Sequence, residues 1–143
     1  MKQLLFAIIA VMISATAFGK DPKTSEKANN GSKDRVEILY FHGKQRCPTC
    51  MSIEKNTQEI MKAYYSDKIK KGEVVFTVID ISNKANEKIA DRYEVTWSSL
   101  FVNKWKGGKE SKNNMTEFAF AYSRNSPDTF KNGLKKKINE LLK

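Results

Sequence analysis

Residues 36–50 read VEILYFHGKQRCPTC, and this stretch decides the fold. Its first six residues are mostly apolar, which is typical of a short strand buried on both faces. From the proline onward, apolar side chains recur at steps of three and four, which predicts an amphipathic helix that continues to about Lys71 and stops at Gly72. Cys47 and Cys50 therefore stand where a buried strand passes into a helix.

The rest of the chain alternates strand and helix patterns. We expect a second buried strand over residues 74–81, a short helix over 85–93 and a third strand over 100–105. A turn over 106–109 leads into an edge strand, and two further helices follow over 116–122 and 126–142. Ser126 is the expected N-cap of the last helix. Phe118, Phe120 and Tyr122 recur at helical spacing, which is typical of core or groove-lining aromatics, and we interpret them as core side chains by default. This order predicts an α/β fold with a central mixed sheet of about four strands and helices on both faces.

Three segments divide the chain by composition. Residues 1–19 join a basic start, a short apolar run and small residues, which is the pattern of a secretory signal peptide cut after Ala17 or Gly19. Residues 20–33 are almost entirely polar, so we interpret them as a flexible tether. The folded domain is expected over residues 34–143, exported to the periplasm or secreted.

The composition excludes several classes of protein. Among 143 residues, 26 Lys and Arg stand against 16 Asp and Glu, which gives a net charge of +10. Two cysteines are too few for a disulfide-dense scaffold or a four-cysteine zinc site. The basic residues are scattered and accompany no nucleic-acid motif, so we expect no nucleic-acid partner and at most a weak attraction to anionic membranes.

The spacing of the two cysteines indicates redox chemistry. Residues three apart at a helix start can close a small disulfide ring around Pro48-Thr49. Cys47, at the exposed end, is the expected attacking thiol, and Cys50, one turn into the helix, the resolving thiol. The helix N-terminus, Arg46 and Lys44 should stabilise a Cys47 thiolate and lower its pKa below the ordinary value of ~8.5.

Two other uses of the same cysteines stay open at this point. Two thiolates with His42 offer sulfur and nitrogen ligands to a soft metal or metalloid such as copper or arsenite. Alternatively, the cysteines form only an inert structural disulfide. His42, five residues before Cys47, either tunes or ligates Cys47 or is a structural side chain. No cofactor is expected for disulfide exchange.

Several segments resemble the thioredoxin superfamily. The resemblance is carried by the strand and cysteine pair over 36–50, the strand over 74–80, and Tyr93-Glu94-Val95 before Leu100-Phe101-Val102. More narrowly, the segments YFHG-x-x-RCPTC, VTWSSLFV and TEFAFAYSR resemble the small exported ArsF family of Bacteroidota, the "nitrophenyl compound nitroreductase subunit". The resemblance implies a thioredoxin-like fold and a dithiol site, and no residue here supports the nitroreductase activity of the family name.

The resemblance also assigns residues around the cysteines. Thioredoxins place a cis-proline opposite the dithiol, and the matching position is Ser99, after Trp97 and Ser98. A cis bond before a residue other than proline costs about 2.5–4 kcal/mol, so we expect a trans peptide there, in a loop that lines the site. Arg46 stands where thioredoxins usually carry tryptophan, and their buried acid has no counterpart, because the strand offers Tyr40 at that place.

The sequence thus predicts an exported thioredoxin-like protein that exchanges disulfides with partner proteins through Cys47 and Cys50. Such a thiol–disulfide oxidoreductase would act on protein thiols and disulfides and would draw electrons from a membrane reductant.

Overall fold

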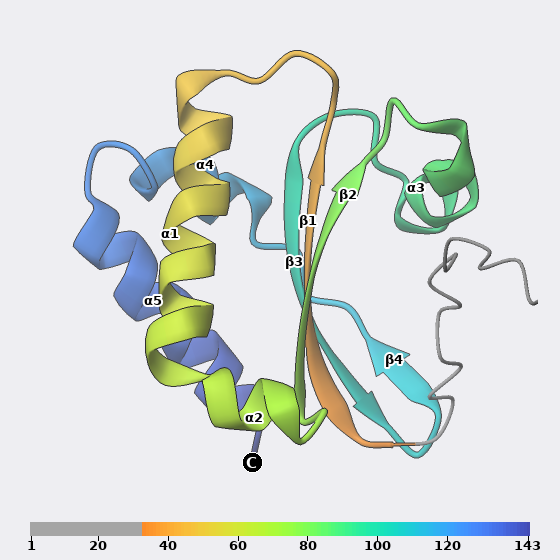
Figure 1. The fold of residues 1–143 in the computed structure, drawn as a ribbon, viewed down its shortest axis with the longest axis vertical. Helices are drawn as coiled ribbons and strands as arrows, with labels where there is room; N and C mark the ends of the chain where they lie inside the picture. The colour runs from red at the N-terminus through yellow and green to blue at the C-terminus, as the bar shows by residue number, and fades with distance from the viewer. Residues whose placement is uncertain (1–32) are drawn as a thin grey trace, which may run out of the picture.

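Strand β1 (Arg35–His42) lies at the centre of a four-stranded mixed sheet (Figure 1). The computed structural model describes residues 33–143. β1 pairs in parallel with β2 (Val74–Asp80) and antiparallel with β3 (Ser99–Lys106), and β3 pairs antiparallel with the short β4 (Lys109–Ser111). The strand order is therefore β2-β1-β3-β4.

Helices cover both faces of this sheet. Their bounds are α1 (Pro48–Tyr64), α2 (Ser66–Lys70), the short 3-10 helix η1 (Lys84–Asn86), α3 (Glu87–Tyr93), α4 (Thr116–Tyr122) and α5 (Pro127–Leu141). Helices α1, α4 and α5 pack on one face, and α3 lies on the other (Figure 1). This arrangement confirms the predicted thioredoxin-like α/β fold.

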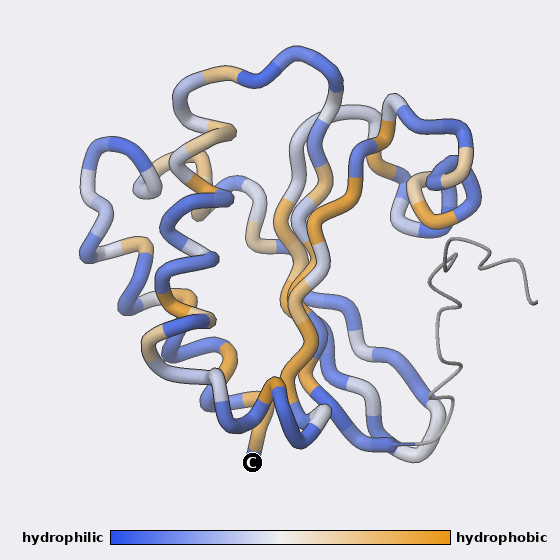
Figure 2. The backbone as a smooth tube through the Cα atoms, in the orientation of Figure 1, coloured by the Kyte–Doolittle hydropathy of each residue, from blue (hydrophilic) through white to orange (hydrophobic). Residues whose placement is uncertain are grey.

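Alternation along β1 explains why it holds the two layers together. Val36, Ile38 and Tyr40 belong to the core cluster beneath α1 and α5, whereas Leu39 and Phe41 belong to the cluster beneath α3. Successive side chains of a strand point to opposite faces, so a run that is apolar throughout fills both cores. Figure 2 shows the hydrophobic residues along these central strands.

β2 is less buried than the sequence predicts. Phe76, Thr77 and Val78 are only partly buried, although the residues of this strand read as a core strand. The reason is topological, because β2 is the edge strand beside β1 and lacks a neighbour on its other side.

The single helix predicted over residues 48–71 is interrupted. α1 ends before Tyr65, whose φ of −123° and ψ of 7° leave the helical region, and α2 follows. The buried Tyr65 ring packs in the core, and its hydroxyl donates a hydrogen bond to Asn139 of α5 at 2.9 Å. Gly72, with a φ of 72°, comes after α2, as predicted for the end of the helical segment.

The sequence predicts an N-capped last helix near the end of the chain, and a signal peptide and a tether before the folded domain. Ser126 occupies the N-cap position of α5, as predicted, although its side chain makes no capping hydrogen bond. The predicted signal peptide, residues 1–19, and the tether up to residue 32 lie outside the described residues. Among the helices of residues 33–143, none has both the length and the apolar character to cross a membrane.

Helices α4 and α5 approach each other closely at a glycine. A Cβ atom placed on Gly133 of α5 would lie only 2.2 Å from the Phe118 ring of α4. That ring is held between Tyr122, at a centroid distance of 5.0 Å, and Phe130, at 6.2 Å. Gly133 is therefore the residue that lets α4 pack against α5.

Gly133→Ala tests this contact. Alanine gains about 1 kcal/mol of helix propensity over glycine, but overpacking a core costs about 1–3 kcal/mol. Since Phe118 is held on both sides, we expect a net loss of about 1 kcal/mol in the free energy of unfolding in urea. In a Phe118→Ala background the same substitution should stabilise the protein. A destabilisation of equal size in both backgrounds would show that the Phe118 ring is not the obstacle.

Candidate functional site

The two cysteines lie where β1 leads into α1. Cys47 is the N-cap residue of α1, and Pro48 occupies the first turn. A disulfide joins Cys47 to Cys50, with 5.0 Å between their Cα atoms. Cys50 is only 6% exposed, whereas Cys47 is partly exposed, so Cys47 presents the more accessible sulfur.

Backbone geometry favours negative charge on Cys47. Its Sγ accepts a hydrogen bond from the N–H of Cys50 at 3.0 Å, as an N-cap side chain does. α1 is 17 residues long and carries no acidic residue in its first turn. In the reduced protein, these N–H groups and the helix dipole would stabilise a Cys47 thiolate.

Arg46 contributes less positive charge to the site than the sequence predicts. Its guanidinium pairs with the carboxylate of Glu54, one turn beyond Cys50 in α1, and both side chains are partly buried. The carboxylate offsets much of the field that Arg46 would exert on Cys47. The positive charge expected of Arg46 beside Cys47 is therefore largely balanced by Glu54, a partner that lies one helical turn beyond the cysteine pair.

Tyr40 lies behind the cysteine pair. Its fully buried hydroxyl donates a hydrogen bond of 2.7 Å to the backbone carbonyl of Cys50. Burial raises the pKa of this hydroxyl, and a hydrogen bond with Ser98 and the charge of Arg46 act in the opposite direction. A phenol with a raised pKa is neutral at physiological pH, so the side chain behind Cys50 is an uncharged hydrogen-bonding group.

A pocket of about 350 Å³ opens beside the disulfide. It is lined by Gly43, Gln45, Cys47, Cys50, Thr96, Trp97, Ser98 and Phe120. Trp97 is 58% exposed, and its ring lies 5.2 Å from that of Phe120, between ring centroids. None of these lining residues is charged, although the chain carries a net charge of +10.

Trp97, Ser98 and Ser99, where the chain enters β3, were expected to line the site. Trp97 and Ser98 line this pocket. Ser99 does not, because it begins β3, pairs with Phe41 and donates its hydroxyl to the carbonyl of Trp97 at 3.1 Å. The peptide before Ser99 is trans, as predicted, since residues 33–143 contain no cis peptide bond.

Four residues that line the pocket are not among the predicted site residues, namely Gly43, Gln45, Thr96 and Phe120, and Phe120 is the most distant of them in the sequence. It lies on α4, 70 residues after Cys50, in a segment interpreted as core. The spacing of aromatic residues in that segment does not distinguish the core face from the face beside Trp97. Phe118 and Phe120 both pack against the core as predicted, and Phe120 lines the pocket as well, while Tyr122 is exposed.

His42 does not join the cysteines. Its Nδ1 lies 3.0 Å from the carbonyl oxygen of Gly43, and its ring packs 6.2 Å from that of Tyr40. His42 is absent from the lining of the pocket beside Cys47 and Cys50. Within residues 33–143, no three His, Cys, Asp or Glu side chains come close enough to hold a metal ion. The alternative ligand set of Cys47, Cys50 and His42 is therefore not assembled.

Several known structures with a similar backbone are thioredoxins. A thioredoxin from Thermus thermophilus is 16% identical, with a TM-score of 0.48 over 74% of this chain and 72% of its own. Mitochondrial thioredoxin 3 from Saccharomyces cerevisiae, in its oxidized form, is 18% identical, with a TM-score of 0.47 over 77% and 82%. No protein-family model matches the sequence. No curated protein matches it either. The thioredoxin-like fold rests on the strand order and pairing described above.

Titration of Cys47 tests the electrostatics of the site. In the reduced protein, with Cys50→Ala so that one thiol titrates, we expect the Cys47 pKa to lie below ~8.5. Glu54→Gln should lower it further, because Arg46 loses its partner. The thiolate is followed by its ultraviolet absorbance against pH.

Glu59→Gln is the matched control for Glu54→Gln. Glu59 lies on the same helix, pairs with Lys131 and changes the net charge equally, but it lies farther along α1 from Cys47. An unshifted Cys47 pKa would contradict the role of the helix N-terminus. Equal shifts in the two variants would contradict the role of the Arg46–Glu54 pair.

Proposed function

We propose that this chain is an exported dithiol/disulfide protein that exchanges disulfides with partner proteins through Cys47 and Cys50. One observation carries the proposal: in a thioredoxin-like fold, the accessible Cys47 caps a helix while its partner Cys50 is buried behind it. This arrangement separates an attacking sulfur from a resolving sulfur. A protein thiol or disulfide is the corresponding substrate.

The exchange proceeds through a mixed disulfide. In the reducing direction, the Cys47 thiolate attacks one sulfur of the partner's disulfide, forms a Cys47–partner bond and releases the other partner sulfur as a thiolate. Cys50 then attacks the Cys47 sulfur, re-forms the internal disulfide and releases the second partner sulfur. The proton of Cys50 passes to one of the partner's thiolates, and two electrons pass to the partner. The reverse sequence oxidises a partner dithiol.

The proposal includes export of the protein and a source of electrons for its disulfide. The sequence pattern of residues 1–19 supports export, and an exported dithiol needs an electron source, for which we propose a membrane reductant. The basic composition supports a weak attraction to anionic membranes. A relation to the ArsF family is supported by the three segments quoted above.

Trapping the mixed disulfide tests the reaction directly. With dithiothreitol as reductant, the unmodified protein should accelerate insulin reduction, and Cys47→Ser should abolish the acceleration. Cys50→Ser should instead accumulate a covalent complex with a disulfide-bearing protein, because the resolving thiol is missing. Mass spectrometry identifies that complex.

Two results would overturn the proposal. No acceleration with any reductant, together with no trapped complex, would leave a structural disulfide. Stoichiometric copper or arsenite binding that survives glutathione and disappears in the Cys47→Ser/Cys50→Ser protein, without any exchange, would establish the alternative metal or metalloid function.

Trp97→Ala tests how the partner is held. The exposed ring lies beside Cys47 in an uncharged pocket, so we expect it to pack on an apolar side chain near the partner's disulfide. Loss of such an aromatic contact, worth about 1 kcal/mol, should slow exchange with a protein disulfide about fivefold. Exchange with glutathione disulfide should change little. A matched exposed aromatic outside the site, Tyr64→Ala, should leave both rates unchanged. Equal slowing of both reactions by Trp97→Ala would contradict a role in partner binding.

A further inference from the structure

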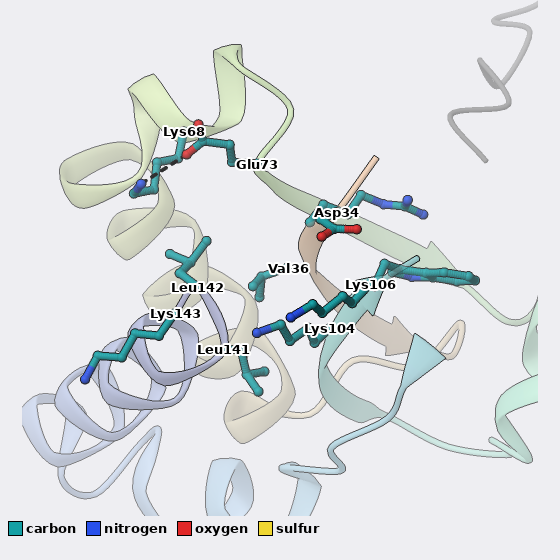
Figure 3. A pocket seen from close by; sticks show the side chains of 11 residues that line it. Asp34, Val36, Lys68, Glu73, Lys104, Lys106, Leu141, Leu142 and Lys143 are labelled. Atoms are coloured by element: carbon teal, nitrogen blue, oxygen red, sulfur yellow. Dashed lines mark hydrogen bonds and ion pairs between the residues drawn. The ribbon is translucent and has the colours of Figure 1, made fainter. Parts of the chain in front are cut away.

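Basic residues that are scattered in the sequence meet at one end of the sheet. Lys68 of α2, Lys104 and Lys106 of β3, and Lys143 after α5 line one pocket of about 190 Å³ (Figure 3). The pocket also includes the start of β1, whereas the cysteines follow the other end of that strand. The fold thus separates a basic pole from the uncharged redox site.

The acidic side chains of the pocket are already engaged. Glu73 pairs with Lys68 at 3.1 Å. Asp34 accepts a hydrogen bond of 2.9 Å from the backbone N–H of Gly107. Neither carboxylate contacts the ammonium groups of the other three lysines.

Three ammonium groups therefore remain available to a ligand. Lys104, Lys106 and Lys143 form no ion pair with any residue in the part of the chain that the structure describes. Figure 3 shows Lys104 and Lys106 extending side by side from β3 toward the end of α5. A single anionic group in the pocket could approach more than one of them.

The surroundings of the pocket are both positive and apolar. The pKa of Glu73 is lowered, first by its hydrogen bond with Lys68 and also by the charges of Lys71 and Lys33. The lining also includes the apolar side chains of Val36, Leu141 and Leu142 and the indole of Trp105. Ile69, on the adjacent helix α2, is a further exposed apolar side chain.

We propose that this basic pocket binds the headgroup of an anionic phospholipid at a membrane surface. Ammonium groups are effective point-charge ligands of phosphate, and the pocket's volume suits a small headgroup. The leucines at the end of α5 and Ile69 would face the glycerol and the first acyl carbons. The composition alone supports only a diffuse attraction, whereas the fold supplies a site.

Binding at this pole would orient the domain. β1 has eight residues and runs from the pocket to the loop that carries Cys47, a distance of roughly 25 Å at about 3.3 Å per residue. The disulfide would then face away from the lipid surface and toward soluble partners. The proposal does not depend on disulfide exchange, because none of the pocket's residues lies in the redox site.

Vesicle co-sedimentation tests the proposal. The full chain is expressed and used in the form in which it is purified from the cells. One arm uses vesicles of phosphatidylcholine with phosphatidylglycerol, and another uses phosphatidylcholine alone, which measures any attachment through apolar residues. A third arm adds soluble glycerol phosphate as a competitor. We expect binding that requires phosphatidylglycerol and is reduced by excess glycerol phosphate.

Two triple variants with the same net charge separate a site from diffuse attraction. Lys104→Gln/Lys106→Gln/Lys143→Gln should weaken binding to the anionic vesicles at least tenfold, since each basic group near such a surface contributes about 1 kcal/mol. Lys84→Gln/Lys88→Gln/Lys136→Gln changes exposed lysines outside the pocket and should weaken it about threefold or less. Circular dichroism checks that both variants fold.

Three results would overturn the proposal: equal losses in the two variants, equal binding to both kinds of vesicle, or binding of glycerol phosphate without any binding to vesicles. Insulin reduction by the pocket variant should be unchanged, which keeps this test separate from that of the redox site.

Discussion

Burial of β1 on both faces is the constraint on which the rest of the structure depends. Its alternating side chains fill two cores, so the strand cannot shift by one residue without exchanging them. The end of β1 is thereby fixed against the sheet, and the following loop must return the chain to α1 on the helical face. Cys47 meets the N-terminus of α1 because of this geometry, and Cys50 turns inward over Tyr40.

The two ends of β1 support different chemistry. At one end, a disulfide lies beside uncharged side chains, and the neighbouring Arg46 is paired with Glu54. The reactivity of Cys47 therefore depends on the backbone N–H groups of α1 more than on neighbouring charged side chains. At the other end, lysines of α2 and β3 and Lys143 after α5 line a pocket whose two carboxylate side chains accept hydrogen bonds from other groups. A net charge of +10 is thus compatible with a redox site that is neutral.

Local patterns predicted the fold and the cysteine pair, because both depend on residues close together in the sequence. The apolar run of β1 and the cysteine spacing are of this kind. Long-range packing was not visible: Tyr65 leaves the helix to reach Asn139 of α5, and Phe120 reaches the redox pocket from α4. The same limit explains why Ser99 was expected to line the site. In the folded chain, Ser99 pairs with Phe41 in the sheet, and the adjacent Ser98 lines the pocket beside the cysteines. Partners such as Glu54, which changes the role of Arg46, likewise emerge only from the folded chain.

The equilibrium between the Cys47–Cys50 disulfide and glutathione, measured in the folded protein, tests the central claim most directly. If Cys47 is an accessible thiol at a helix N-terminus and Cys50 resolves it, the pair should be reduced and reoxidised in one reversible two-electron transition. The near-ultraviolet circular dichroism should show that the core is folded at both ends of this transition. A disulfide that opens only when the protein is unfolded would contradict the account and establish a structural role for the cysteine pair.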